Sequence, residues 1–253
     1  MEKWALVTGA TAGIGWATAE TLAKQGYSIL ATGRRPERLE ELQKHLAKVA
    51  PEAKFQAGTF DVSDRFEVSE FVKNHQSTLE KVEVLVNNAG LAKGVEKIQE
   101  GQLDDWETMI DTNVKGLLFM TRAVLPLMLK KNSGHIVNLG SVAGRWTYPG
   151  GAVYCATKFA VRALSEGLRM DLLGSKIRVT NIEPGMVQSE FSLVRFEDQS
   201  KADKVYEGMT PLAAQDIADT IAWCVARPAH VNVQELVIYP TDQAHVGQVA
   251  RKS

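Results

Sequence analysis

Cysteine, net charge and long apolar runs are all scarce in this chain of 253 residues. Its two cysteines, Cys155 and Cys224, are too few for a disulfide framework and lack the spacing of a metal site. The five histidines are scattered, with no cluster of carboxylates or cysteines beside them, so we expect no bound metal. The formal net charge is −1 and no basic stripe accompanies it, which argues against nucleic acid as a partner.

No apolar stretch approaches the ~20 residues that a membrane-spanning helix needs, so no membrane partner is expected. The first residues enter a strand-like run and lack the layout of a secretory signal. Hydrophobic residues make up 45% and charged residues 23% of the chain, which is ordinary for a globular protein. We therefore expect a reduced, cytoplasmic enzyme or binding protein, folded as a single domain over residues 1–253.

Short apolar, β-rich runs alternate with helix-like segments along the whole chain. Strands are expected at 3–8, 28–32, 54–60, 82–86, 135–139, 177–182 and 235–239. Helices are expected at 16–25, 36–49, 65–79, 104–131, 153–173 and 215–226, with a break or bend at Pro126. This alternation predicts a doubly wound (Rossmann) α/β fold, whose seven-stranded, mainly parallel sheet carries helices on both faces.

Two segments do not follow the alternation. Residues 186–212 have weak periodicity and form the longest irregular stretch. Because long ordered loops in compact domains are often functional, we interpret this stretch as a substrate lid; a surface excursion with two short helices is the alternative. The tail, 240–253, has no apolar pattern, and two alternatives stay open for it: packing against a second subunit, or disorder.

A glycine-rich turn, Gly9 to Gly15 with the spacing G-x3-G-x-G, follows the first strand and opens the first helix. Glycines let the backbone approach a pyrophosphate closely, and a helix N-terminus offers free N–H groups to it. The turn therefore favours dinucleotide binding over a simple tight connection. Thr11, Ala12, Gly13 and Ile14 lie within it.

The second strand ends in Arg34 and Arg35, where an acidic residue would bind the ribose hydroxyls of NAD. Guanidinium groups match a 2′-phosphate, so NADP(H) is the expected cofactor; the alternative is that one of them, Arg35, only faces solvent. Asp61 and Val62 after the third strand are candidates for the adenine contact, or for a helix cap. After the fourth strand, Asn88, Ala89 and Gly90 are either cofactor contacts or an ordinary turn.

Tyr154 and Lys158 stand four residues apart within an expected helix, which places both on one face. A cation within about 4–6 Å favours the phenolate and lowers the pKa of a tyrosine. The pair therefore suits a tyrosine proton donor, although such a spacing alone is more often a solvated stripe. Ser141 and Asn113 stand at places in the chain compatible with this role. Taken singly, Ser141 could equally be a strand-end cap, and Asn113 a polar residue that faces solvent.

Together these residues resemble the short-chain dehydrogenase/reductase family, over most of the chain and in the family's order. The matching residues are 8–15, 87–90, Asn113, Ser141, Tyr154, Lys158, Pro184 and Gly185. The resemblance implies that Tyr154 is the general acid or base, that Lys158 lowers its pKa and holds the nicotinamide ribose, and that Ser141 binds the substrate oxygen. It further implies that Asn113 positions a water, that the backbone at Val187 and the hydroxyl of Ser189 contact the cofactor, and that the assembly is a homotetramer formed partly by helices 104–131 and 153–173.

Residues 105–113, 190–196 and 231–233 resemble more closely the NADP-dependent 3-hydroxy acid dehydrogenases, which act on serine, allo-threonine and related acids. A carboxylate substrate needs a cation, and Arg145 and Arg195 are the candidates, each equally open to the interpretation of a surface ion pair. The alternatives are a broader NADPH-dependent carbonyl reductase for neutral ketones or aldehydes, and a non-catalytic NADP(H) sensor.

Overall fold

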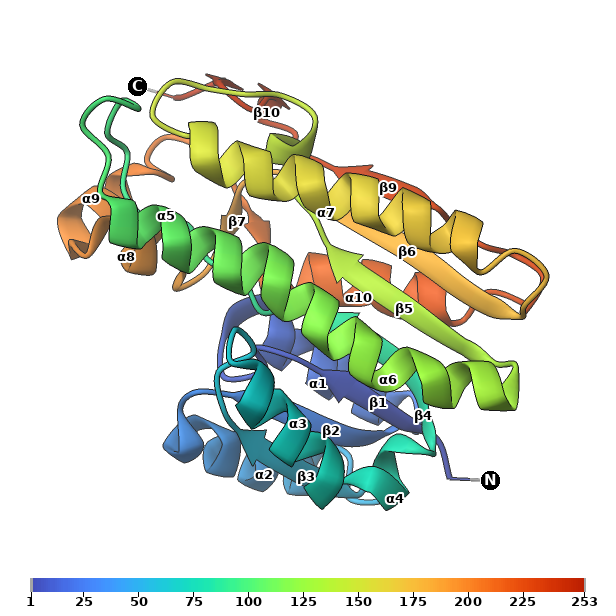
Figure 1. Cartoon of the computed structure of the whole chain (residues 1–253). Helices are drawn as coiled ribbons and strands as arrows, with labels where there is room; N and C mark the ends of the chain where they lie inside the picture. Colours follow the sequence, from blue (N-terminus) through green and yellow to red (C-terminus); the bar gives the residue numbers. More distant parts are fainter. Residues whose placement is uncertain (1, 253) are drawn as a thin grey trace.

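A sheet of seven parallel strands, in the order β3-β2-β1-β4-β5-β6-β9, forms the centre of the computed structural model, which describes residues 2–252 (Figure 1). The strands are β1 (Trp4–Val7), β2 (Ser28–Gly33), β3 (Phe55–Thr59), β4 (Val82–Asn87), β5 (Gly134–Leu139), β6 (Ile177–Pro184) and β9 (Glu235–Ile238). Every pairing in this sheet is parallel. The expected doubly wound α/β fold is confirmed.

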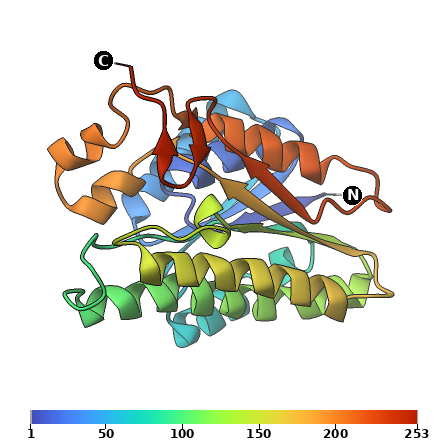
Figure 2. The ribbon, with the colours of Figure 1, turned by 90° about the horizontal axis from the view of Figure 1, so that it is seen from above.

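Helices cover both faces of the sheet, which is seen between its two helical layers in Figure 2. One layer comprises α1 (Gly13–Lys24), α2 (Pro36–Val49) and α10 (Ala214–Val225); the other comprises α3 (Arg65–Asn74), α6 (Leu117–Lys131) and α7 (Ala152–Asp171). Successive residues of a strand point to opposite faces, and β1 serves both layers in this way. Its Trp4 and Leu6 pack with α3 and α6, while Ala5 and Val7 pack with α1 and α2.

The long helical region departs from our expectation at Pro126. Here α5 (Leu103–Ile110) passes into a π-helical stretch, Asp111–Gly116, and then into α6, which contains Pro126. Pro126 and Arg122 are both exposed, so water can satisfy the carbonyl that a proline leaves unbonded. Because α6 continues through Pro126, the predicted break is wrong, while the alternative of a bend there stays a prediction; the irregular hydrogen bonding lies in the π-helical stretch.

Two helix boundaries also differ from those predicted. The helix expected at 65–79 divides into α3 and α4 (Gln76–Leu79), because the backbone at His75 leaves helical geometry and its ring bonds the carbonyl of Phe71. The first helix begins at Gly13, inside the glycine-rich turn rather than after it. The backbone N–H groups of this first turn therefore lie at the end of β1.

The lid candidate and the tail are more regular than expected. Residues 186–212 contain β7 (Val187–Gln188), α8 (Phe191–Phe196), α9 (Gln199–Lys204) and the start of β8 (Leu212–Ala213). The tail forms a hairpin of β10 (Gln243–His245) and β11 (Gln248–Val249). It packs against its own chain: the N–H of Met186 donates to Gln243 Oε1 at 2.8 Å, and that of Lys252 to the carbonyl of Gly208 at 2.8 Å.

Disorder is therefore wrong for the tail as far as Lys252, while Ser253 lies outside the described residues. Between residues 2 and 252, none of the helices is sufficiently long and apolar to cross a membrane.

Candidate active site

A pocket of about 450 Å³ opens at the carboxyl ends of the strands, where the strand order reverses between β1 and β4. It brings together most of the predicted cofactor residues, namely Gly9, Thr11, Ala12, Gly13, Ile14, Arg34, Arg35, Asp61, Val62, Asn88, Ala89, Gly90, Pro184, Gly185, Val187 and Ser189. Ser141, Tyr154 and Lys158 line the same pocket. Gly15, Asn113, Arg145 and Arg195 lie outside this lining.

The glycine-rich turn is fixed by close packing against the end of β4. Gly9 has a φ of +63°, and a Cβ on Gly15 would come within 2.3 Å of the Gly9 carbonyl oxygen, so neither position accepts a side chain without strain. Asn88 holds the turn in place, because its Nδ2 donates to the carbonyls of Thr8 and Gly9 at 2.9 and 3.1 Å. The close packing of this turn against the end of β4 therefore depends on glycine at both positions.

Both arginines after β2 face this pocket. Arg35 donates to Thr11 Oγ1 at 3.1 Å and pairs with Glu190 at 2.9 Å, while Arg34 lies 3.6 Å from Asp61. The Arg35 side chain is 42% exposed and that of Arg34 is 61% exposed. The alternative in which Arg35 only faces solvent is therefore wrong, because its guanidinium contacts both Thr11 and Glu190. Asp61 caps the turn at Ser63, whereas Asp64 caps α3.

Tyr154 and Lys158 are both buried near the start of α7, so they do not belong to a solvated stripe. The Nζ of Lys158 lies 5.9 Å from the Tyr154 ring centroid and donates to the carbonyl of Leu139 at 2.8 Å. Burial lowers the pKa of Lys158 to about 8. Burial also raises the pKa of Tyr154, against the opposing effects of the Ser141 hydrogen bond and the charge of Arg195. The expected lowering of the Tyr154 pKa by Lys158 is therefore not seen in this structure, where burial raises that pKa instead.

Ser141 lies where β5 leaves the sheet. It caps a short 3-10 turn, Val142–Gly144, and its Oγ accepts from the N–H of Ala143 at 3.1 Å. The same Oγ is 3.5 Å from the carbonyl oxygen of Pro184, and it interacts with the Tyr154 side chain. Ser141 and Tyr154 therefore line one pocket, and the Ser141 hydroxyl lies close to the end of β6.

Asn113 lies in the π-helical stretch and is 2% exposed, so it does not face water as the alternative assumed. Its side-chain amide pairs with both backbone groups of Leu91 at 2.8 Å, and its Nδ2 also donates to Thr157 Oγ1 at 3.0 Å. Thr157 in turn donates to the carbonyl of Tyr154 at 2.7 Å. Asn113 thereby joins the loop after β4 to the first turns of α7.

The two candidate substrate arginines have different surroundings. Arg145 ion-pairs through Nε with Glu183 and through Nη2 with Glu235, so its charge is compensated by two carboxylates. This does not fit the prediction that Arg145 binds a substrate carboxylate.

Arg195 instead donates to the carbonyl of Gly94 at 3.2 Å and to Tyr148 Oη at 2.8 Å. Within residues 2–252, no carboxylate lies within 4 Å of it. Its guanidinium lies 6.0 Å from the ring centroid of Tyr154, and both residues line a smaller cleft of about 40 Å³.

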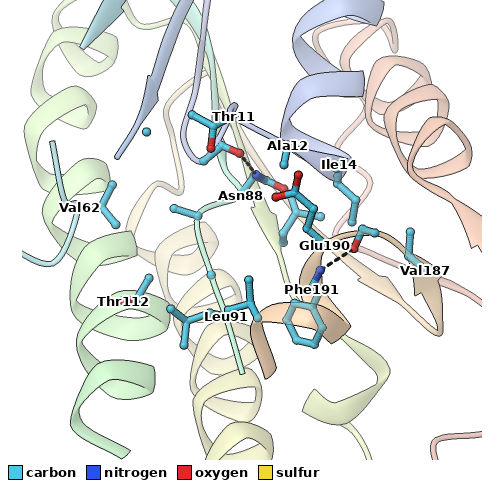
Figure 3. A pocket seen from close by; sticks show the side chains of 18 of the residues that line it. Thr11, Ala12, Ile14, Val62, Asn88, Leu91, Thr112, Val187, Glu190 and Phe191 are labelled. Atoms are coloured by element: carbon cyan, nitrogen blue, oxygen red, sulfur yellow. Dashed lines mark hydrogen bonds between the residues drawn. The ribbon is translucent and has the colours of Figure 1, made fainter. Parts of the chain in front are cut away.

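The start of α8 contributes residues that sequence reasoning missed. Glu190 and Phe191 line the pocket, and Figure 3 shows them on one side of it, with Val62 and Thr112 on the other. The Phe191 ring meets Tyr154 edge-on, with centroids 5.7 Å apart. Glu183 was missed as well, although a carboxylate inside an apolar strand signals a buried charge that needs a partner.

A doubly wound parallel sheet with a pocket at its strand-order reversal defines an α/β protein of the Rossmann type. Within that class, the chain belongs to the short chain dehydrogenase family, whose sequence model matches residues 3–200. The expected family is confirmed.

Two curated proteins and one solved structure are similar over nearly their whole lengths. The chain is 47% identical over 250 residues to the NADP-dependent 3-hydroxy acid dehydrogenase YdfG of Salmonella typhi, covering 98% of this chain and 99% of that protein. It is 45% identical over 246 residues to sulfoacetaldehyde reductase 2 of Chromohalobacter salexigens, covering 96% of each. The closed form of a serine dehydrogenase complexed with NADP+ superposes with a TM-score of 0.90 at 45% identity, covering 98% of this chain and 99% of that one.

Proposed function

We propose that this chain is an NADP(H)-dependent oxidoreductase that interconverts a small 3-hydroxy acid, of the serine, allo-threonine or 3-hydroxypropionate type, with its 3-oxo acid or semialdehyde. The observation that carries the proposal is the surroundings of Tyr154, where Ser141, Lys158 and Arg195 lie, and no carboxylate of residues 2–252 pairs with Arg195. The activities for which the YdfG relative and the serine dehydrogenase are named support the same class of substrate.

The pocket fits a phosphorylated dinucleotide. The glycine-rich turn leaves room for a pyrophosphate beside the first N–H groups of α1, whose cap position, Ala12, provides no side-chain bond to them. Arg34 and Arg35 would hold a 2′-phosphate. Arg35 would then exchange its ion pair with Glu190 for one with the phosphate. We assign the remaining lining residues at the ends of β4 and β6 to the nicotinamide half. When bound, the reduced cofactor supplies a hydride.

Charge development decides the roles of the protein side chains. Hydride arrival at a carbonyl carbon leaves negative charge on the oxygen, and two hydrogen-bond donors aimed at that oxygen stabilise it. We assign these donors to Ser141 and Tyr154, with Tyr154 giving its proton in reduction and accepting one in oxidation. A raised pKa keeps the phenol protonated at neutral pH, which is the form that donates. Lys158 would hold the ribose, and the assignment of a water to Asn113 stays a prediction.

We assign the substrate carboxylate to Arg195. Among residues 2–252 its guanidinium is held only by neutral acceptors, so an arriving anion would meet a cation beside Tyr154 that these residues leave without a carboxylate partner. Sulfoacetaldehyde, the substrate for which one relative is named, carries a sulfonate anion, and a cation at the position of Arg195 would suit a sulfonate as well as a carboxylate. Residues 186–212 would act as the lid that brings Arg195 over the substrate.

For assembly and compartment we propose a homotetramer in the cytoplasm. The helical layer of α6 and α7 leaves apolar side chains exposed, among them Leu118, Leu129 and Phe159, which a neighbouring subunit would cover. Both cysteines are buried and unpaired, as suits a reducing compartment. Light scattering of the purified protein would test the stoichiometry.

The proposed function is tested by a substrate panel with a Tyr154→Phe control. Malonic semialdehyde, serine, allo-threonine, sulfoacetaldehyde and a neutral ketone are compared by NADPH absorbance, with NADH in parallel. We expect turnover of the acids, preference for NADP(H), and loss of turnover in Tyr154→Phe with NADPH binding nearly intact. Full activity of Tyr154→Phe would refute the mechanism, and faster reduction of the neutral ketone would favour a general carbonyl reductase.

A further inference from the structure

Four charged side chains alternate in sign behind Ser141. Arg162 of α7 donates to Glu235 of β9 at 3.1 Å, Glu235 also pairs with Arg145, and Arg145 pairs with Glu183 at the end of β6. Two cations therefore balance two carboxylates, and the chain of contacts joins the partly exposed Arg162 to the fully buried Glu183. Arg145 and Glu183 form its inner end.

Glu183 is a charge without access to water, because it is fully buried. It receives hydrogen bonds from Arg145 Nε and from Asn181 Nδ2, the latter at 2.6 Å. A buried carboxylate is tolerated only with such partners. Glu183 directly precedes Pro184, which lines the pocket, so the pair lies at the working edge of the sheet.

Arg145 closes the turn that Ser141 opens. Ser141 is the N-cap and Arg145 the C-cap of the same 3-10 turn, and the N–H of Gly144 donates to the Ser141 carbonyl at 2.8 Å. On the other side of Ser141, the N–H of Gly140 donates to the carbonyl of Ile182 at 2.8 Å. The turn is thus fastened to β6 on both sides of Ser141: by a backbone bond before it and by the Arg145–Glu183 pair after it.

We infer that Arg145 and Glu183 are positioning residues that hold the Ser141 hydroxyl against Tyr154 and the end of β6. The inference rests on the proposed function, in which Ser141 donates to the substrate oxygen. Arg145 acts here through Ser141 and does not touch the substrate. Hydrogen bonds that stabilise a developing charge depend steeply on donor placement, so a loosened turn lowers kcat rather than cofactor affinity.

A double-mutant cycle between Arg145→Lys and Ser141→Ala tests this inference. The lysine keeps the charge but loses the fork that reaches two carboxylates. With malonic semialdehyde and NADPH, we expect Arg145→Lys to lower kcat about tenfold, with the Kd for NADPH unchanged. In the Ser141→Ala background the same substitution should cost less than twofold. An equal loss of kcat in both backgrounds would overturn the inference.

Two further variants complete the experiment. Arg162→Lys makes the same chemical change at the outer end of the charge chain, and we expect it to change kcat less than twofold; a loss as large as that of Arg145→Lys would overturn the inference. If Arg145→Lys does not fold, Glu183→Gln, which keeps the shape of the side chain but removes its charge and one of its two acceptor oxygens, enters the same cycle with the same two outcomes. Wild-type kcat in Ser141→Ala alone would instead refute the role of Ser141 in the proposed function, whatever the cycle gives.

Discussion

Two groups of charges lie around Tyr154, and they are compensated in opposite ways. Behind Ser141, Arg145 faces Glu183 and Glu235. Near the phenol itself, Arg195 and Lys158 have only neutral acceptors among residues 2–252. These are the carbonyls of Gly94 and Gly150 and Tyr148 Oη for Arg195, and the carbonyl of Leu139 for Lys158. The paired charges suit a structural role, and the cations without carboxylate partners suit the binding of ligands.

The cost of burial explains why this difference matters. A buried charge with a partner of opposite sign contributes little net stability, but its partner becomes indispensable. A cation left with neutral acceptors loses hydration without that compensation, so an arriving anion gains more from it. The difference between Arg145 and Arg195 can therefore be tested by substitutions of these arginines and of their partners.

The largest effect is expected from Arg145→Met, which leaves the fully buried Glu183 without its cation. We expect the free energy of unfolding to fall by about 3–5 kcal/mol, measured by urea denaturation at fixed protein concentration. Burial raises the pKa of Glu183, and the variant lacks the Arg145 charge that opposes this effect. A raised carboxyl pKa means that stability is lost as pH rises, so the deficit should shrink as pH falls toward about 5.

The double variant Arg145→Met, Glu183→Gln is the control, because it removes both charges. It should recover most of the lost stability, to within about 2 kcal/mol of the wild type. A single variant that loses less than about 1 kcal/mol would show that the pair is not needed.

The next effect concerns binding, not stability. Arg195→Ala should lower kcat/KM for a 3-hydroxy acid about 100-fold, by removing a charge-assisted hydrogen bond, and should change that for a neutral ketone less than about threefold. Lys93→Ala is the matched control: Lys93 lines the same cleft but pairs with Asp105 and Glu197, each at 3.3 Å. We expect little effect of Lys93→Ala. Equal losses for acid and ketone in Arg195→Ala would remove the carboxylate assignment.

The cost of burying the Lys158 cation can be measured from the pH dependence of stability, in protein without cofactor. Its pKa falls from 10.5 unfolded to about 8 folded, so the native state releases this proton first as pH rises. Below pH 8, Lys158 is protonated in both the folded and the unfolded state, and burying its charge lowers the free energy of unfolding by the full amount. Between about pH 8 and 10.5 the folded state loses this proton, and the penalty disappears. Lys158→Met should therefore be more stable than the wild type at pH 7, by about 1–3 kcal/mol, with the gap closing by pH 10. A gap that stays constant with pH in urea denaturation would contradict this.

The sequence was sufficient for features set by local spacing. The glycine-rich turn follows a strand, and Tyr154 and Lys158 stand one helical turn apart, so both predictions needed only the order of residues. The partners of Arg145 were not predictable in this way, because Glu183 and Glu235 lie 38 and 90 residues away along the chain. The same spacing argument left Arg145 and Arg195 equivalent, although within residues 2–252 Arg145 has carboxylate partners and Arg195 has neutral acceptors.

Tertiary demands also overrode local propensity elsewhere. Proline predicted a break within the long helix, yet the irregular stretch surrounds Asn113, whose side chain pairs with the backbone of Leu91, 22 residues away. The tail has no apolar pattern, and its order depends on contacts such as that of Gln243 with Met186, 57 residues apart. Such contacts become visible only when the parallel strands bring distant loops to one edge of the sheet.

The smallest effect separates the charge of Arg195 from its orientation. Tyr148→Phe removes the hydroxyl that accepts from Arg195 Nη1 at 2.8 Å, while the bond to the carbonyl of Gly94 remains. Because the cation is kept and only its direction is loosened, we expect KM for a 3-hydroxy acid to rise about three- to fivefold, which corresponds to less than about 1 kcal/mol. The substitution should be silent when it is added to Arg195→Ala, since no guanidinium is then left to orient. A further loss in that background would mean that Tyr148 acts on Tyr154 or the substrate by another route.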